Sequence, residues 1–154
     1  MRKITNLFLF LTPILAGCSD ENTQALTNRI DARTFTLETP PGWTLTEDQG
    51  YDTYIGRVSD RDHTIFFDQG FLSFNGLNTI TEYEGTLSFE RVTINGVSAI
   101  IHKRKIMSTS TAGIILSAYL EDENTGKRNH LYIWDPSSSS ETLLIQIFKT
   151  HQFK

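Results

Sequence analysis

Apolar and polar residues alternate along much of the chain after residue 30, and this period of two is typical of strands with one buried face. Pro40-Pro41-Gly42 interrupts the alternation once, and the polar residues 59–62 interrupt it again. The pattern therefore predicts short strands joined by turns. The first four predicted strands lie at residues 34–38, 43–46, 53–58 and 64–67, with a loop expected at 47–50.

The segment 87–106 contains the clearest hairpin signal. Asn95-Gly96 separates two alternating runs, and both residues accept the positive φ angles that a two-residue turn requires. Residues 114–120 are almost continuously apolar, which predicts a central strand. Residues 130–134 form the last predicted strand, after a turn at 121–127.

The last segment changes to the spacing of an α-helix. Apolar side chains recur at intervals of three and four, at Leu143, Leu144, Ile147 and Phe148. Ser138 and Glu141 have the spacing of a capping box, so we expect the helix to begin there. The sequence therefore predicts an α+β fold, a single domain of mostly antiparallel β-sheet with a C-terminal helix, and a β-sandwich is the alternative.

The first 17 residues differ in character from the rest. Arg2 and Lys3 precede an apolar run of 13 residues, 4–16, which is the layout of a secretory signal peptide. This run is interrupted by polar residues and is shorter than the roughly 20 residues that a membrane-spanning helix needs. Cys18 follows it and is the only cysteine of the chain, so an intramolecular disulfide is excluded.

Leu15-Ala16-Gly17-Cys18 resembles the lipobox of bacterial lipoproteins. The resemblance implies cleavage before Cys18, transfer of a diacylglycerol to its thiol and, often, acylation of the new amine. Two or more acyl chains hold a protein firmly at a bilayer. Ser19 is similar to the residue that favours transport to the outer membrane, and Asp20-Glu21 resembles a surface-export signal of Bacteroidota, although a solvated linker explains both. An ordinary cysteine after an ordinary signal peptide is the alternative.

These features divide the chain into a signal peptide at 1–17, a lipidated Cys18 with a polar, flexible tether at 18–29, and one globular domain at 30–154. The signal peptide removes two basic residues and no acidic residue, so the formal net charge falls from −4 to −6. Such an acidic protein is poorly suited to nucleic acid or to anionic lipid surfaces. We therefore expect a cell-envelope location, favouring the outer membrane, contact with the bilayer through acylated Cys18 alone, and no nucleic-acid partner.

The order of strand, Pro-Gly-Trp, several strands and a terminal helix that ends near an aromatic residue resembles the Mog1/PsbP-like domains. The segments that carry this resemblance are Thr34–Trp43 and Ser138–Phe153. It implies helices packed on an antiparallel sheet, and a domain that binds partners rather than one that catalyses. The short helical content here departs from the second helical layer of that family.

The densest group of candidate metal ligands is Asp60, Asp62, His63 and Asp68. Oxygen ligands at alternating positions can hold calcium, and a histidine adds a softer ligand. The glycine and terminal glutamate of a calcium-binding loop are absent from this segment. A polar turn between two strands explains the same residues, and we expect no metal and no cofactor.

The other candidates form no recognisable motif. The four histidines are not in a sequence pattern with a nucleophile, and Ser117 lacks the flanking glycines of a nucleophile elbow. The basic run 102–105 suits either an acidic partner or an exposed strand whose charges prevent edge pairing. Seven aromatic residues are either core or a ligand-stacking surface: Trp43, Tyr51, Tyr54, Phe71, Phe74, Tyr132 and Trp134.

Two functional classes follow from this pattern. The first is a non-enzymatic envelope lipoprotein that binds a protein, a glycan or a small ligand, with Cys18 as its one assigned site. The second is a small membrane-tethered hydrolase or metal-binding protein that uses the Asp60–Asp68 region. We expect the first class, because no catalytic constellation is visible. Convergence of the carboxylates with a histidine in a concave pocket would favour the second.

Overall fold

A computed structural model describes residues 24–70, 73–107 and 112–154, so the signal peptide and Cys18 lie outside the described residues. The described parts contain a 3₁₀-helix, η1 (Leu77–Thr79), and an α-helix, α1 (Glu141–Lys149). Their strands are β1 (Asn28–Asp31), β2 (Phe35–Thr39), β3 (Thr44–Gln49), β4 (Tyr54–Ser59), β5 (Thr64–Gln69), β6 (Thr86–Ile94), β7 (Val97–Met107), β8 (Ala112–Asp122), β9 (Lys127–Trp134) and β10 (Gln152–Phe153).

The strands form two sheets in which the pairings are antiparallel. The small sheet has the order β1-β2-β10, and the large sheet has the order β3-β4-β5-β9-β8-β7-β6. In the large sheet β3 and β6 are the edge strands, while β7, β8 and β9 are interior. The prediction of an antiparallel β-rich domain with a C-terminal helix is confirmed, and the two sheets remain compatible with the sandwich description.

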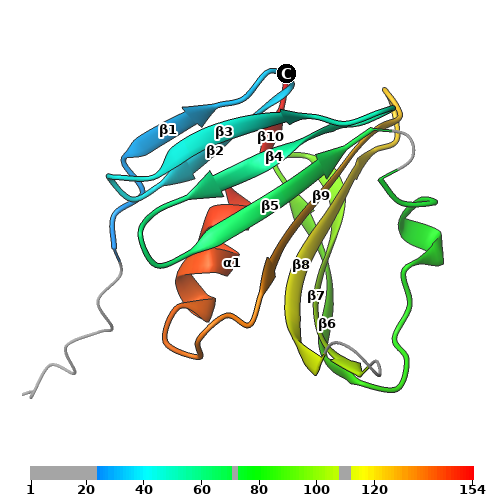
Figure 1. The fold of residues 1–154 in the computed structure, drawn as a ribbon. Helices are drawn as coiled ribbons and strands as arrows, with labels where there is room; N and C mark the ends of the chain where they lie inside the picture. Colours follow the sequence, from blue (N-terminus) through cyan, green and yellow to red (C-terminus); the bar gives the residue numbers. More distant parts are fainter. Residues whose placement is uncertain (1–23, 71–72, 108–111) are drawn as a thin grey trace, which may run out of the picture.

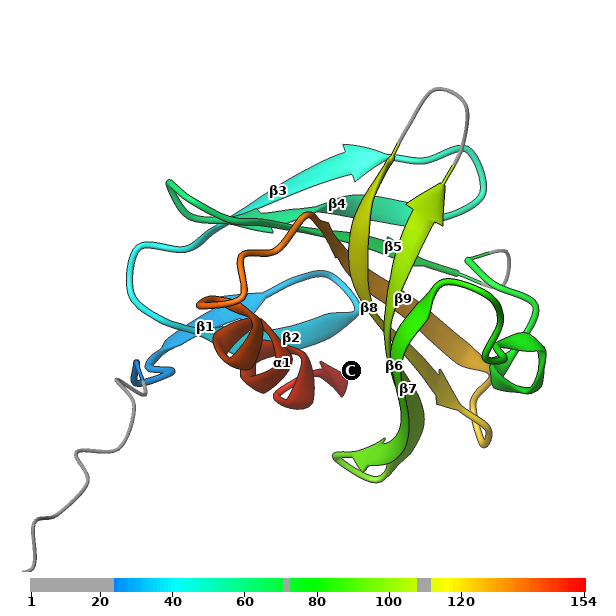
Figure 2. The ribbon, with the colours of Figure 1, turned by 90° about the horizontal axis from the view of Figure 1, so that it is seen from below.

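The small sheet and α1 both pack on one face of the large sheet, as Figures 1 and 2 show. The ring of Phe35 in β2 meets the ring of Phe67 in β5 edge-on, with 5.1 Å between their centroids. Leu144, Ile147 and Phe148 of α1 are fully buried in the same core. Burying one such side chain stabilises a fold by roughly 1.5–3 kcal/mol. The apolar residues whose spacing predicted the helix therefore form the stripe that packs α1 against the large sheet.

The opposite face of the large sheet is partly covered by the segment that connects β5 to β6 (Figure 1). Phe74 and Leu77 of this segment pack on Ile100 and Tyr119, which point away from the main core. The rings of Phe74 and Tyr119 lie edge-to-face at 5.5 Å. We call this side of the sheet the outer face, and it carries most of the polar clusters described below.

The hairpin and the central strand were predicted correctly. Asn95 and Gly96 have φ angles of 48° and 86°, and Ile94 pairs with Val97 across the turn. The apolar segment 114–120 lies within β8, which has a strand on each side.

The predicted capping box is wrong. The helix begins at Glu141, and Ser140, which precedes it, makes no side-chain capping hydrogen bond. The Glu141 carboxylate instead pairs with Lys103 Nζ of β7 at 2.5 Å. The glutamate therefore joins the helix to the large sheet rather than closing its own first turn.

Several element boundaries also differ from the prediction. β3 continues through residues 47–49, which were predicted as a loop, because an exposed edge strand needs no apolar alternation. The short strands β1 and β10 both pair with β2, and the sequence pattern did not predict either pairing. The basic run 102–105 lies in the interior strand β7, so defence of a sheet edge does not explain it. Among the described residues, no helix has both the length and the apolar character needed to span a membrane.

Candidate functional site

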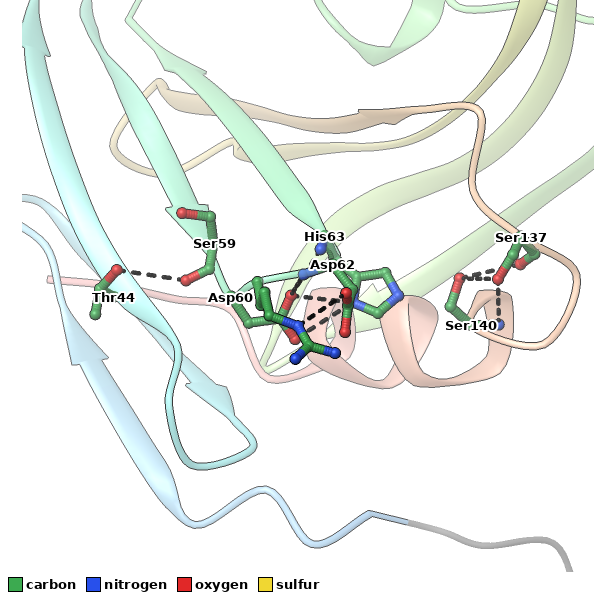
Figure 3. Close-up of polar contacts among 8 residues, drawn as sticks. Thr44, Ser59, Asp60, Asp62, His63, Ser137 and Ser140 are labelled. Atoms are coloured by element: carbon green, nitrogen blue, oxygen red, sulfur yellow. Dashed lines mark hydrogen bonds and ion pairs between the residues drawn. The ribbon is translucent and has the colours of Figure 1, made fainter.

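The turn between β4 and β5 is built around the Asp60 carboxylate (Figure 3). Its Oδ1 accepts the backbone N–H of Asp62 at 2.8 Å and that of His63 at 2.6 Å. This local pattern is the one by which aspartate stabilises turns. Partial burial alone would raise the pKa of Asp60, but these hydrogen bonds and the His63 imidazole outweigh burial and lower it. Asp60 is therefore an ionised carboxylate that belongs to its own turn.

The His63 side chain is held on two sides. Its Nδ1 lies 3.2 Å from Asp60 Oδ1, and its ring lies parallel to the buried Trp43 ring with 5.9 Å between centroids. Figure 3 shows the imidazole directed toward the loop that carries Ser137 and Ser140. Asp60 and Trp43 thus fix the ring with its far edge toward that loop.

This imidazole lines a cleft of about 330 Å³ between the β4–β5 turn and the loop that leads from β9 to α1. The cleft combines two aromatic rings, two carboxylates and no lysine or arginine among the described residues that line it. Those residues are Asp62, His63, Thr64, Phe66, Ile133, Trp134, Asp135, Pro136 and Ser137. We call it the Trp134 cleft, because the Trp134 side chain is 41% exposed there.

Asp135 is fixed at the end of β9 by a cross-strand clamp. Its N–H donates to the Ile114 carbonyl at 2.7 Å, and its Oδ1 accepts the Ile114 N–H, also at 2.7 Å. Its φ of 46° is uncommon for a residue other than glycine. A Cβ on Gly113 would lie 2.8 Å from Asp135 Oδ1, so only glycine leaves room for this carboxylate. The negative charge at this end of the cleft therefore has a defined position.

The serine loop serves the helix start rather than the imidazole. Ser137 Oγ accepts the Ser140 N–H at 3.2 Å and lies 2.8 Å from Ser140 Oγ and 3.0 Å from Ser139 Oγ. Among the described contacts, none joins Ser137 to His63. The serine run is thus a loop before the helix, as predicted, but its side-chain hydrogen bonds lie within the loop and do not form the predicted Ser138–Glu141 cap.

The four predicted metal-ligand candidates separate in the structure. Asp60 and His63 pair, and Asp62 faces the neighbouring cleft. Asp68 lies near the other end of β5, where it pairs across the sheet with His130. Within the described ranges, no group of three or more His, Cys, Asp or Glu side chains is placed to hold a metal ion.

The fold creates a serine–histidine contact that the sequence did not reveal. His130 Nε2 lies 3.2 Å from Ser117 Oγ on the outer face, and the His130 ring stacks on Tyr119 at 4.2 Å. Burial, with a smaller contribution from Arg104, lowers the pKa of His130 to about 3. Ser117 is only 1% exposed, so its hydroxyl is not open to a substrate. The pair satisfies buried polar groups, and only the strand register would have predicted it.

The other two histidines are also enclosed. His102 lies between the edge-on rings of Tyr83 and Phe89, and its Nε2 is 3.1 Å from Thr86 Oγ1. His151 is fully buried, and its Nε2 accepts the Asn129 side-chain amide at 2.9 Å. Burial is the main cause that lowers the pKa of both.

A larger hollow lies beside the β3–β4 turn. It measures about 690 Å³ and is lined by Arg33, Tyr54 and residues 47–53. Burial, together with a hydrogen bond to Glu47, raises the pKa of Tyr54 to about 12, so this hydroxyl stays protonated. Tyr51 is fully exposed on the rim. Of the seven aromatic candidates, Trp43 and Phe74 are core, Tyr51 and Trp134 are exposed, and Phe71 lies outside the described residues.

Comparison with solved structures shows the fold. The solution structure of PsbP from the cyanobacterium Synechocystis sp. PCC 6803 is similar, with a TM-score of 0.60 and 10% sequence identity over 91% of this chain and 99% of that chain. A crystal structure from Bacteroides thetaiotaomicron has a TM-score of 0.49 and 10% identity over 78% of this chain and 45% of that chain. No family model and no curated protein sequence matches the chain. The domain therefore has a PsbP-like fold, which confirms the fold part of the resemblance.

Proposed function

We propose that the chain is a lipid-anchored protein of the bacterial envelope whose domain binds a ligand and does not catalyse a reaction. The lipobox at residues 15–18 supports the anchor. β1 begins ten residues after Cys18. Acyl chains on Cys18 would hold the domain close to its membrane, with the outer membrane favoured by Ser19.

The observation that carries the binding proposal is the composition of the Trp134 cleft. The exposed Trp134 lines the cleft together with Asp62 and Asp135, and no lysine or arginine is among the described lining residues, although Arg61 outside the cleft pairs with Asp62 at 3.4 Å. Aromatic faces attract cations, tryptophan most strongly, and the Asp135 carboxylate, which makes no described ion pair, adds to that attraction. The ligand class that suits this cleft is an organic ammonium group, such as a lysine side chain of a partner.

The volume of about 330 Å³ is at the lower end for ligand pockets. It suits a single side chain or a small amine better than a large cofactor. The fixed positions of Asp135 and His63 mean that little of the binding free energy is lost in ordering the cleft.

Fluorescence of Trp134 gives a direct test. Trp43→Phe leaves Trp134 as the only tryptophan, and an N-acetylated lysine amide serves as the probe. We expect saturable quenching that the Nε-acetylated form of the probe does not produce. Asp135→Asn should weaken binding at least tenfold while keeping the turn, because asparagine also tolerates positive φ. Asp52→Asn, on the exposed β3–β4 turn, is the matched control and should bind normally. Equal quenching by both probes would contradict the proposal.

A second candidate function is hydrolysis at the Asp60–His63 pair. A carboxylate that orients an imidazole at the edge of a cleft is an arrangement used by general bases. Against it, Ser137 bonds to Ser139 and Ser140 rather than to His63. Hydrolysis of ester, phosphate or glycoside substrates that is lost in His63→Ala would favour this candidate. A metal-dependent rise in melting temperature, lost in Asp62→Ala, would favour a metal site instead.

A further inference from the structure

Arg104 is a half-buried cation without an anionic partner among the described residues. The strand alternation places it with His102 on the outer face of β7, while Lys103 points to the other face and pairs with Glu141. The described ion pairs do not include Arg104. Its Nη1 donates to the Tyr83 hydroxyl, and its Nε is buried with no hydrogen-bond partner.

Among the described residues around this guanidinium, none forms an ion pair with it. The groups that feel its charge most are His102, Tyr119 and His130, and burial keeps all three neutral at neutral pH. Glu82 acts on His102 but makes no described ion pair with Arg104. Buried charges in proteins are normally paired, because removing an ion from water without a counter-charge is unfavourable. The missing partner is therefore an anion.

A pocket of about 480 Å³ adjoins the guanidinium. Arg104, Lys105 and Glu84 line it, and the alternation of β7 places Arg104 and Ile106 on one face of the strand and Lys105 on the other, so Arg104 is the cation that a ligand on the outer face would meet. The Tyr83 ring and Ile106 supply apolar surface. The arginine carbon Cζ lies 5.8 Å from the Tyr83 ring centroid, which keeps the planar fork close to that ring.

We propose that this pocket binds a small organic carboxylate, with Arg104 as the residue that recognises the charge. A guanidinium presents paired donors that match the two oxygens of a carboxylate. Because Nε is buried and Nη1 donates to Tyr83, the donors left for a ligand are those of Nη2 and the second N–H of Nη1. The apolar body of the ligand lies against Tyr83 and Ile106. The site is separate from the Trp134 cleft, so an experiment that overturns one of the two binding proposals leaves the other unaffected.

Benzoate and benzamide are a matched pair of probes, because they have the same ring and differ in charge. The ¹H–¹⁵N spectrum of the full chain in non-ionic detergent contains the side-chain Nε–H signal of Arg104. We expect benzoate to move this signal and the amide signals of Gly85 and Ile106 saturably, and benzamide to leave them in place.

Arg104→Lys keeps the charge but removes the fork, and it should weaken benzoate binding at least tenfold. Arg57→Lys, an exposed arginine on the same sheet that pairs with Asp48, is the matched control and should bind as the natural chain does. The movement of the Nε–H signal is measured on the natural chain, so it tests the proposal even if Arg104→Lys does not fold. No saturable shift at Arg104, or equal shifts with benzamide, would overturn the proposal.

Discussion

Buried histidines dominate the chemistry of this domain at the scale of single residues. His130 stacks between Tyr119 and Tyr132, and His151 stacks on Phe35. Both rings are held in surroundings that disfavour their charged form, so burial lowers each pKa from 6.5 to about 3. Their common role is to fill the interior while satisfying one polar partner each.

These two residues should make the domain sensitive to mild acid. The folded pKa lies below the unfolded value, so below pH 6.5 the unfolded chain binds protons that the folded chain does not. Stability is therefore complete above pH 7 and falls with pH, by about 1.4 kcal/mol per pH unit for each histidine once well below 6.5. Urea unfolding at pH 7, 5.5 and 4.5 measures the loss, and the interval from pH 7 to 5.5 lies above the range in which the carboxylates titrate.

A variant assigns this loss to one histidine. His151→Gln should be less stable at pH 7, because it disturbs the contacts with Asn129 and Phe35. Its stability should nevertheless decline less steeply between pH 6.5 and 4.5. A natural chain whose stability is flat across this interval would contradict the argument.

The sequence could not have placed these residues, and the reason is specific. Ser117 and His130 are thirteen positions apart, and their contact depends on the pairing of Ser117 with Tyr132 and of Tyr119 with His130. A shift of one residue in that register would put the two side chains on opposite faces. By contrast, Asp60 and His63 lie in one turn, and the sequence predicted this turn because its interactions join residues only three positions apart.

At the scale of secondary-structure elements, the sequence predicted the turns and the buried apolar stripe of the helix, but it did not predict the short edge strands. The Asn95-Gly96 hairpin and the apolar stripe of α1 each have a strong local signal. β10 consists of two residues, and β1 of four, so neither is long enough to display a period. Both depend on pairing with β2, which brings together segments from the two ends of the domain.

The turn between β6 and β7 provides the test at this scale. Gly96→Val should destabilise the domain by about 1–2 kcal/mol, because a β-branched residue resists a φ of 86°. Gly96→Asn is the matched control and should lower the free energy of unfolding by less, since asparagine adopts a positive φ more readily. A Cβ at this position would meet no atom within 4 Å, so any loss reflects the backbone alone. Equal urea midpoints for Gly96→Val and the natural chain would show that the turn is not constrained in this way.

At the scale of the whole molecule, the fold separates a packed interior from surface clefts, two of which carry the binding proposals. One face of the large sheet is sealed by α1 and the small sheet, and η1 covers part of the other. The Trp134 cleft contains Asp135, and the second pocket contains Arg104, and neither of these charged side chains makes a described ion pair. These two sites are the basis of the binding proposals above. The PsbP-like fold agrees with this account but does not specify a ligand.

The sequence suggested the fold class and a PsbP-like resemblance, but it did not locate either open site. Trp134 was predicted as a strand end and named as one of seven possible ligand-stacking aromatics, but only the fold brings it and Asp135 into one cleft with Asp62. Arg104 was one charge in a basic run until the alternation of β7 separated it from Lys103. A site whose residues come from distant segments has no characteristic local spacing, so the sequence alone does not reveal it.

The central claim is that this domain is held at a membrane by lipid on Cys18, and one measurement tests it directly. The chain is expressed in a diderm bacterium, the membrane fraction is extracted with detergent, and the intact mass is determined. We predict a protein that begins at Cys18 and carries a diacylglycerol, with or without a further acyl chain, and a Cys18→Ser variant that is neither lipidated nor cleaved there. An unmodified natural chain that begins at any other residue would contradict the account.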